Sequence, residues 1–442
     1  MLPRDIDTAD ALRHLSTRPD DSPQGLSRRR FLQAITMGAG GVLAGPALFG
    51  SGFAGMIPGF EDHMAEAAPL GPNEGVLVVV TLAGGNDWLN TVVPHGQSQY
   101  YTRRGSLAYP ANVCWGLGPT NPGIGLTPNL VKLKQRYDKG DVAVLQGIGL
   151  WDDPPTFSHF DSMARWMNGL PPGTLTSTGW LGRYLDGLPA NPFAAVSIDE
   201  SIPQHLIGNS RKAMALSTGG APFGGTPDAT WDLMYKGISD FGLAPTGLSA
   251  WGDTVAASAR EMIQTAALAD PLYDWILPEG PLVKKLTLAS RLINANLGTR
   301  VISVTLGNFD SHKGQPGMHP VRMQELDAGI EAFFAHVLPQ FAGRVSMLVF
   351  SEFSRTPTRN DSNGFDHGWA GDAFLIGDHV AGGVKGTVLN IQTLESNNHI
   401  KPTMNNREVY SSILSGWLGG DPTSILGGAV TPVPGLFASG PS

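Results

Sequence analysis

Four short polar clusters in the chain contain the residue types that bind metal ions and transfer protons. Each follows a stretch with the pattern of a buried strand, and open α/β sheets place their ligands at the carboxyl ends of such strands. The clusters are Asn86-Asp87, Phe309-Asp310-Ser311-His312, Ser351-Glu352-Phe353-Ser354-Arg355 and Phe365-Asp366-His367-Gly368. We therefore expect them at one edge of one sheet, within reach of a common site.

The spacing inside the clusters indicates metal binding. Asp310 and His312 are two residues apart, so both project to the same side of extended backbone and can reach one ion. Asp366 and His367 are adjacent, which suits a loop that runs between two ions. Oxygen and imidazole donors favour zinc, manganese, magnesium or calcium, and two ions ~3.5–4 Å apart are typical of phosphoryl transfer. Cys114 is the only cysteine, which excludes an intrachain disulfide and a zinc-thiolate centre.

A fifth cluster, Ser158-His159-Phe160-Asp161, begins a predicted helix. The unpaired N–H groups at a helix start favour a bound anion, and a neighbouring metal would make the Ser158 hydroxyl a nucleophile. The same serine also suits a helix cap, and His159 also suits a hydrogen-bonded core position.

Structural roles remain open for the other candidates as well. Asp87 follows Gly-Gly-Asn and can hold a turn through its own side chain. Glu352 and Arg355 can pair with each other as buried ions or clamp a substrate. A purely structural role is hardest to find for Asp366-His367, because glycines lie on both sides and no nearby helix start needs a cap.

The elements that must position these clusters alternate along the chain. The predicted strands are 75–83, 141–148, 194–198, 301–306, 346–350 and 373–376. The predicted helices are 127–139, 158–168, 253–268, 282–296, 321–341 and 407–418. Strands joined by crossover helices predict an α/β fold, with a mostly parallel sheet and helices on both faces. Residues 208–247 are rich in Gly, Pro and Ser and predict an irregular excursion.

The first 67 residues are predicted to be a leader, and residues 68–442 the α/β domain. Ser27-Arg28-Arg29-Arg30-Phe31-Leu32-Gln33 fits the twin-arginine export pattern, and Ala65-Glu66-Ala67 offers a cleavage site. We expect a periplasmic or secreted protein, with the twin-arginine translocase as a partner during export. No stretch after residue 68 is apolar enough for a stable membrane span. The formal charge of −8 argues against a nucleic-acid partner.

The clusters and the leader together resemble a large bacterial domain-of-unknown-function family, numbered 1501. The motifs that carry the resemblance are Gly84-Gly85-Asn86-Asp87-Trp88-Leu89-Asn90, Ser158-His159-Phe160, Phe309-Asp310-Ser311-His312, Glu352-Phe353-Ser354-Arg355-Thr356-Pro357, Asp366-His367-Gly368 and Arg407-Glu408-Val409-Tyr410 to Trp417-Leu418-Gly419. They span nearly the whole chain after the leader.

That family in turn resembles the alkaline phosphatase and sulfatase superfamily, and the resemblance implies an alkaline-phosphatase-like fold and one or two divalent metal ions. It implies Ser158 as nucleophile, with His159 or Arg355 steadying an anion. The implied ligands are Asp87, Asp310, His312, Asp366 and His367. The superfamily's further C-terminal histidine has no recognisable counterpart here, so Glu352 is expected to complete the metal shell.

The sequence leads to a metal-dependent hydrolase of phosphate or sulfate esters, with two alternatives. One is a non-catalytic envelope protein that binds carbohydrate or a protein partner, which the ten tryptophans and the 208–247 excursion favour. The other is a metal-free serine hydrolase, against which the absence of a Gly-x-Ser-x-Gly elbow argues. Whether the chain is an enzyme is left open by its sequence.

Overall fold

A computed structural model describes residues 43–44, 69–150, 155–174, 176–210, 213–219, 233, 236–238, 240, 242, 247, 250–273, 277–395 and 398–442. The twin-arginine motif at 27–33 and the predicted cleavage site at 65–67 lie outside these residues. Much of the predicted excursion at 208–247 lies outside them too.

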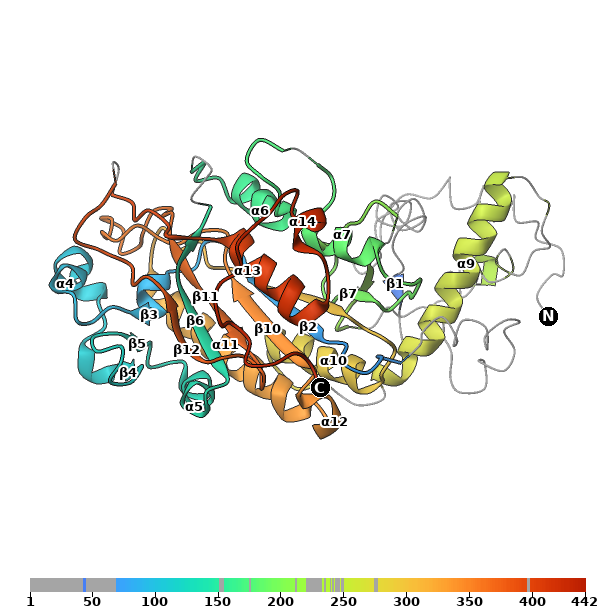
Figure 1. Ribbon diagram of the computed structural model, residues 1–442, viewed down its shortest axis with the longest axis horizontal. Coiled ribbons are helices and arrows are strands. Elements are labelled where there is room, and N and C mark those ends of the chain that lie inside the picture. The colour runs from blue at the N-terminus through green and yellow to red at the C-terminus, as the bar shows by residue number, and fades with distance from the viewer. Residues whose placement is uncertain are drawn as a thin grey trace.

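One twisted sheet forms the centre of the described chain (Figure 1). Its strands, in spatial order, are β1 (Leu43–Ala44), β8 (Met214–Leu216), β7 (Ala195–Ser197), β9 (Val301–Leu306), β2 (Val76–Leu82), β10 (Val345–Phe350), β11 (Gly371–Ile376), β6 (Val142–Gly149) and β12 (Gly383–Gly386). A short strand, β13 (Met404–Asn405), also pairs with β6. Among these described strands, β11 alone runs antiparallel to its neighbours.

The central strand β2 is buried on both faces, as its unbroken β-branched run predicts. Val76, Val78 and Val80 point into one apolar core, and Leu77 and Val79 point into the other. The two-residue period of a strand thus divides one apolar sequence between two cores.

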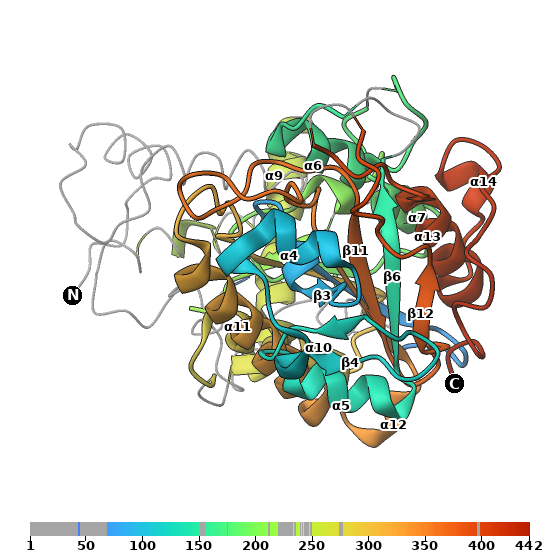
Figure 2. The same cartoon turned by 90° about the vertical axis from the view of Figure 1, so that its left-hand side faces the viewer.

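Helices cover both faces of the sheet, as Figure 2 shows. The helices that pack into the first core are α5 (Val131–Lys139), α10 (Pro281–Asn294), α11 (Gln315–His336) and α12 (Pro339–Ala342), together with the end of α9 (Ala250–Ala269). The helices that pack into the second core are α6 (His159–Asn168), α7 (Trp180–Asp186), α13 (Asn406–Ile413) and α14 (Pro422–Ile425). The predicted α/β class, mostly parallel with helices on both faces, is confirmed.

A smaller layer lies at the left end of Figure 1. It contains a three-stranded sheet of β3 (Val92–Val93), β5 (Gly125–Leu126) and β4 (Trp115–Gly116), the helix α4 (Ser98–Arg104), and the short turn η3 (Trp88–Asn90). Further short helical turns are η4 (Gly105–Leu107), η5 (Ala111–Val113), η6 (Gln204–Leu206), η7 (Asp270–Tyr273) and η8 (Leu414–Leu418). This layer was not predicted from the sequence, because its strands are only two residues long.

Three predicted helices have different bounds in the structure. The helix predicted from 127 begins at Val131, because the N–H of Thr127 donates to Thr91 and continues the pairing of β5. The helix predicted over 321–341 begins at Gln315 and ends at His336, and α12 restarts at Pro339. The last predicted helix leaves α-geometry after Ile413 and continues as the π-helical turn η8.

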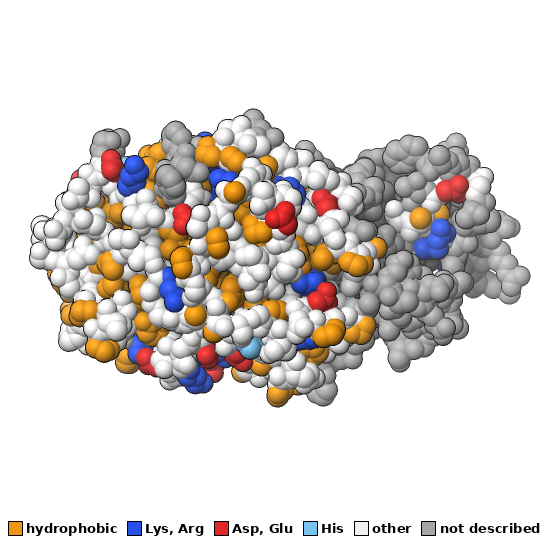
Figure 3. Space-filling view, viewed as in Figure 1, with side chains coloured by type: hydrophobic (Ala, Val, Ile, Leu, Met, Phe, Trp, Pro, Cys, Tyr) orange, Lys and Arg blue, Asp and Glu red, His pale blue; other side chains and the backbone are white. Residues whose placement is uncertain are grey.

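None of the described helices combines the length and the apolar character needed to cross a bilayer. On the face in Figure 3, hydrophobic, acidic and basic side chains are interspersed among the described residues.

Candidate metal centre

Three of the four predicted clusters follow strands that are neighbours in the sheet, whereas the fourth, Phe365-Asp366-His367-Gly368, precedes β11 and so was wrongly predicted to follow a strand. β9, β2 and β10 lie side by side and are parallel, so their carboxyl ends share one edge. The loop after β10 then folds back on itself, with Arg355 bridged to His367, before β11 begins. Because β11 is antiparallel, it starts at the edge where β10 ends, and the last cluster therefore returns to the same edge.

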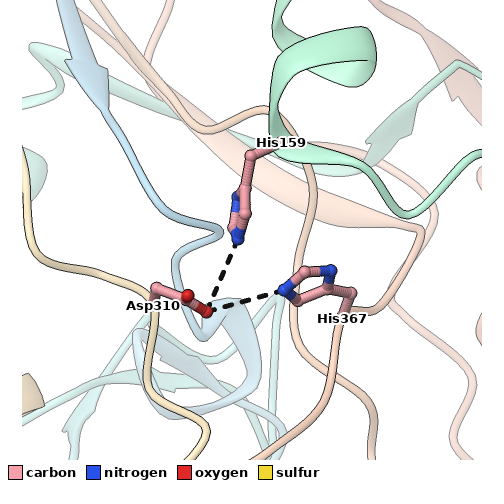
Figure 4. Close-up of side chains that lie close together, drawn as sticks. All are labelled: His159, Asp310 and His367. Atoms are coloured by element: carbon pink, nitrogen blue, oxygen red, sulfur yellow. Dashed lines mark ion pairs between the residues drawn. The ribbon is translucent and has the colours of Figure 1, made fainter.

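Three side chains from distant parts of the chain converge there (Figure 4). His159 extends from the start of α6, Asp310 from the loop after β9, and His367 from the segment before β11. Nε2 of His159 and Nε2 of His367 each lie 3.5 Å from Oδ1 of Asp310. These donor atoms all lie within 4.8 Å of one another, so they can hold one metal ion.

His312 adds a third imidazole to this group. Its Nε2 lies 3.1 Å from Asp310 Oδ1 and 2.9 Å from Nε2 of His367. Ligands bound tetrahedrally at the usual zinc–nitrogen distance of about 2.0–2.1 Å are separated by about 3.3 Å. The observed separations are close to that value. We name His159, Asp310, His312 and His367 the convergent group.

The second nitrogen of each imidazole has a hydrogen-bond partner. Nδ1 of His159 lies 2.7 Å from Glu352, Nδ1 of His367 lies 2.6 Å from the carbonyl of Phe157, and Nδ1 of His312 lies 3.2 Å from Asp366. All three partners accept, so each Nδ1 carries a proton, and in the neutral ring Nε2 is the nitrogen left to bind a metal. Metal-binding histidines are oriented in this way. Nε2 of His159 is buried and makes no hydrogen bond within the described part of the chain.

Glu352, predicted as a metal ligand, instead lies behind His159. Its buried carboxylate accepts hydrogen bonds from the N–H of Gly84 and the hydroxyl of Ser351, besides that of His159. Its hydrogen bond to the ring, more than any other influence, raises the pKa of His159. Glu352 thus orients a member of the convergent group and is not itself a member.

Asp366, also predicted as a ligand, faces outward. Its side chain is 65 % exposed, and Oδ1 contacts Nδ1 of His312 and accepts from the amide of Asn360. The adjacent His367 points inward. The side chains of the two adjacent residues diverge, as predicted, but both contact His312 and so lie at one group of donor atoms and not at two.

Arg355, predicted to steady an anion, is fully buried and ties three loops together. Its guanidinium donates to the carbonyls of Gly84, Gly85, Phe309 and Phe365 and, at 2.7 Å, to Asp310. Burial alone would raise the pKa of Asp310, but the Arg355 hydrogen bond and charge outweigh it and lower that pKa. Arg355 and Glu352 do not pair with each other: each holds a different member of the convergent group.

Asp87, also predicted as a metal ligand, pairs with an arginine and is not part of the convergent group. It is buried and makes a bidentate ion pair with Arg104 at 2.6 and 2.7 Å. Burial by itself raises the pKa of this carboxyl, yet the Arg104 charge outweighs the burial and the pKa is lowered. Both oxygens have protein partners, so neither joins the convergent group.

Ser158, the predicted nucleophile, caps α6. Its hydroxyl accepts from the N–H of Asp161 at a long 3.4 Å, so the cap bond is weak. The preceding Phe157 has a φ of 54°, which is unfavourable for a residue with a side chain. Its ring stacks on His399, with centroids 4.2 Å apart. This backbone conformation directs the Phe157 carbonyl at His367, next to Ser158 in sequence.

Several residues that hold the centre carried no sequence signal. The Phe157 carbonyl acts through its backbone, and Arg104 lies on α4, which was not predicted. Gln315, which accepts a hydrogen bond from Ser311, lies in the first turn of α11, six residues before the predicted start of that helix.

The chain is similar to several solved structures at low sequence identity. A protein in the alkaline phosphatase superfamily from Vibrio parahaemolyticus is 12% identical with a TM-score of 0.35, covering 93% of this chain and 75% of that one. The PsFucS1 sulfatase from Pseudoalteromonas sp. is 13% identical with a TM-score of 0.35, covering 82% and 72%. The lipoteichoic acid synthase LtaP from Listeria monocytogenes is 8% identical with a TM-score of 0.31, covering 85% and 80%. No curated protein matches the chain significantly.

A family model matches the second half of the chain. The matched segment includes Asp310, His312 and His367 of the convergent group, and it leaves out Asp87 and the Ser158-His159 pair. The resemblance read from the motifs is confirmed over this segment. Residues 248–415 match the family described as Protein of unknown function (DUF1501).

Proposed function

We propose that the chain is a metal-dependent hydrolase of phosphate or sulfate esters, acting at the convergent group. The main support for the proposal is that the Nε2 atoms of three histidines lie close to one oxygen of Asp310. Each of these imidazoles is also fixed by a hydrogen bond from its Nδ1. Such a donor set fits zinc or another divalent ion that accepts nitrogen and oxygen ligands.

A bound divalent ion would supply Lewis-acid stabilisation of the ester's anionic group. The chain's own residues would do the rest. Glu352 and Phe157 hold His159 and His367 in place, and Arg355 holds Asp310. Ser158, which directly precedes His159 in the sequence, is the proposed nucleophile. Its hydroxyl would lose its proton and attack the phosphorus or sulfur as the ester alcohol leaves, and water would then release the phosphate or sulfate from the serine. The N-terminal end of α6 favours a negatively charged group beside that hydroxyl.

The decisive experiment is metal analysis of the purified protein, with matched Asp310→Ala and Asp366→Ala variants. We expect about one divalent ion per chain in the wild type, none with Asp310→Ala, and weakened binding with Asp366→Ala. Hydrolysis of 4-nitrophenyl phosphate and 4-nitrophenyl sulfate is then measured on the loaded protein. A wild-type protein that takes up no divalent ion on titration would contradict the proposal.

The second candidate is a non-catalytic binding protein, which one observation favours. Phe160, next to His159 on the first turn of α6, is 91 % exposed. An exposed aromatic ring can stack on a sugar ring or pack against a protein partner. This candidate expects Phe160→Ala to weaken retention on an immobilised polysaccharide, while Ser158→Ala has no effect.

We also propose that the chain is exported in folded form by the twin-arginine translocase. Support comes from the sequence at 27–33 alone. Fractionation of cells that express wild-type protein or an Arg28→Lys/Arg29→Lys variant tests it. We expect the shortened mature form outside the cytoplasm for the wild type only; equal export of the variant would contradict the proposal.

A further inference from the structure

We propose that the buried Asp87–Arg104 ion pair positions both metal-binding loops, through Gln315 and Ser311 on one side and Phe365 on the other. We name these five residues the support network. The inference rests on the proposed metal centre and gives Asp87 a positioning role in place of the ligand role that the sequence suggested.

The ion pair lies beneath the loops and is inaccessible to solvent. Asp87 follows β2, Arg104 ends α4, and both side chains are completely buried. A buried charge pair is costly to desolvate and is maintained only where its geometry and hydrogen bonds are good. Here both carboxylate oxygens and both terminal guanidinium nitrogens are used. The pair is therefore a fixed point between two layers of the fold.

The first connection runs through Gln315 to the loop that carries Asp310 and His312. The amide nitrogen of Gln315 donates to Asp87 Oδ2, and its amide oxygen accepts from the hydroxyl of Ser311 at 2.8 Å. Ser311 lies between Asp310 and His312 in sequence. It is buried, while its two neighbours have side chains about half exposed, at 50% and 45%. Arg355 also holds Asp310, and the hydrogen bond of Ser311 adds a second, buried restraint on the same loop.

The second connection runs through Phe365 to the loop that carries His367. The Arg104 guanidinium lies over the Phe365 ring, 4.1 Å from its centroid. The N–H of Phe365 donates to the carbonyl of Ser311 at 3.1 Å, which joins the two loops directly. Displacement of the ion pair would therefore shift His312 and His367 together.

Glutamine is suited to position 315 because one neutral side chain must both donate and accept. Glutamate has nearly the same shape but lacks the donor and would place a second carboxylate against Asp87. Gln315→Glu is thus the sharpest single change. Gln97→Glu is the matched control. Like Gln315, Gln97 donates one hydrogen bond and accepts one, but its partners are the carbonyl of Leu389 and the N–H of Ile391, which are not part of the convergent group.

The test measures affinity for Zn²⁺ by chelator competition, together with the visible spectrum of the Co²⁺-loaded protein. We expect Gln315→Glu to weaken Zn²⁺ binding by about 10- to 100-fold, as loss of a second layer of support typically does, and to alter the Co²⁺ spectrum. Gln97→Glu should leave both unchanged. Ser311→Ala, a milder change, should weaken binding in the same direction even if Gln315→Glu fails to fold.

Hydrogen exchange of the metal-free protein separates this inference from the proposed function. We expect Ser311→Ala and Gln315→Glu to accelerate exchange in residues 309–315 and 364–368, with no such change in Gln97→Glu. Wild-type affinity and exchange in Gln315→Glu and Ser311→Ala would overturn the inference alone. A wild type that binds no Zn²⁺ would overturn the proposed function, and this inference with it.

Discussion

The carboxylate of Glu352 lies 2.7 Å from Nδ1 of His159, the ring nitrogen opposite the one that faces Asp310. Glu352 is itself fixed by Gly84 and Ser351, so the orientation of the His159 ring is set from behind by a rigid acceptor. A carboxylate in this position makes the far nitrogen a better metal ligand. We therefore expect Glu352 to influence the metal affinity of the centre through His159, without binding the ion itself.

Replacement of Glu352 by glutamine should therefore weaken the centre without removing a ligand. Because the hydrogen bond to Glu352 raises the pKa of His159, we expect that pKa to fall in Glu352→Gln when it is followed by NMR in metal-free protein. Affinity for Zn²⁺ should fall by about 10- to 100-fold. An unchanged pKa and affinity would show that Glu352 has no such role.

Asp87→Asn should mainly lower stability and only weaken metal binding, whereas Asp310→Asn should abolish metal binding. Asp87→Asn leaves Arg104 buried without its counter-charge, so the free energy of unfolding should fall by about 3–5 kcal/mol. Asp310 is half exposed, so water can partly screen the Arg355 charge that Asp310→Asn leaves behind; this variant should lose less stability than Asp87→Asn and should abolish metal binding. Urea unfolding and metal titration of both variants provide the measurement. An Asp87→Asn variant with wild-type stability and complete loss of metal binding would contradict the positioning role and favour Asp87 as a ligand.

Two substitutions of Ser158 separate its helix cap from its proposed chemistry. Ser158→Ala should lose about 1 kcal/mol of stability, whereas Ser158→Asn should keep the cap and the stability. Both variants should bind metal, and both should lose ester hydrolysis if the hydroxyl attacks. Thermal unfolding and turnover are measured in parallel. Hydrolysis retained by Ser158→Asn would exclude Ser158 as the nucleophile.

Asp372 should make the stability of the protein depend on pH. Complete burial raises the pKa of this carboxyl to about 8 from 3.8, and its one hydrogen-bond donor from the backbone is the N–H of Gly147. The folded state therefore keeps a proton that the unfolded chain releases. Between pH 4 and 8, the free energy of unfolding should fall with rising pH by up to about 1.4 kcal/mol per unit.

Asp372→Asn removes that titration. The stability difference between Asp372→Asn and the wild type should shift in favour of the variant as the pH rises, and level off above about pH 8. Urea unfolding at pH 5, 6, 7 and 8 measures it, and other titrating groups cancel in the difference. A difference that stays constant with pH would show that Asp372 is not buried as described.

Much of the fold could be predicted from local pattern, and less of the site. The strand Val76–Leu82 begins with five consecutive apolar residues, so its position and burial follow from its sequence. The two-residue strands β3 and β4 have no such signal, and α4 was missed with them. The ion pair between Arg104 and Asp87 could therefore not be predicted, although the two residues are only 17 positions apart.

Sequence patterns predicted that the clusters at 86–87, 309–312 and 351–355 follow buried strands of one mostly parallel sheet, and hence that they share one edge. They did so because strand periodicity and crossover connections are local properties of the chain. Only the tertiary structure decided which carboxylates face the centre. Asp87 turned to Arg104, Glu352 to His159, and Asp366 to His312, because a buried carboxylate takes the nearest cation or donor. That choice depends on distances between loops that no spacing in the sequence records.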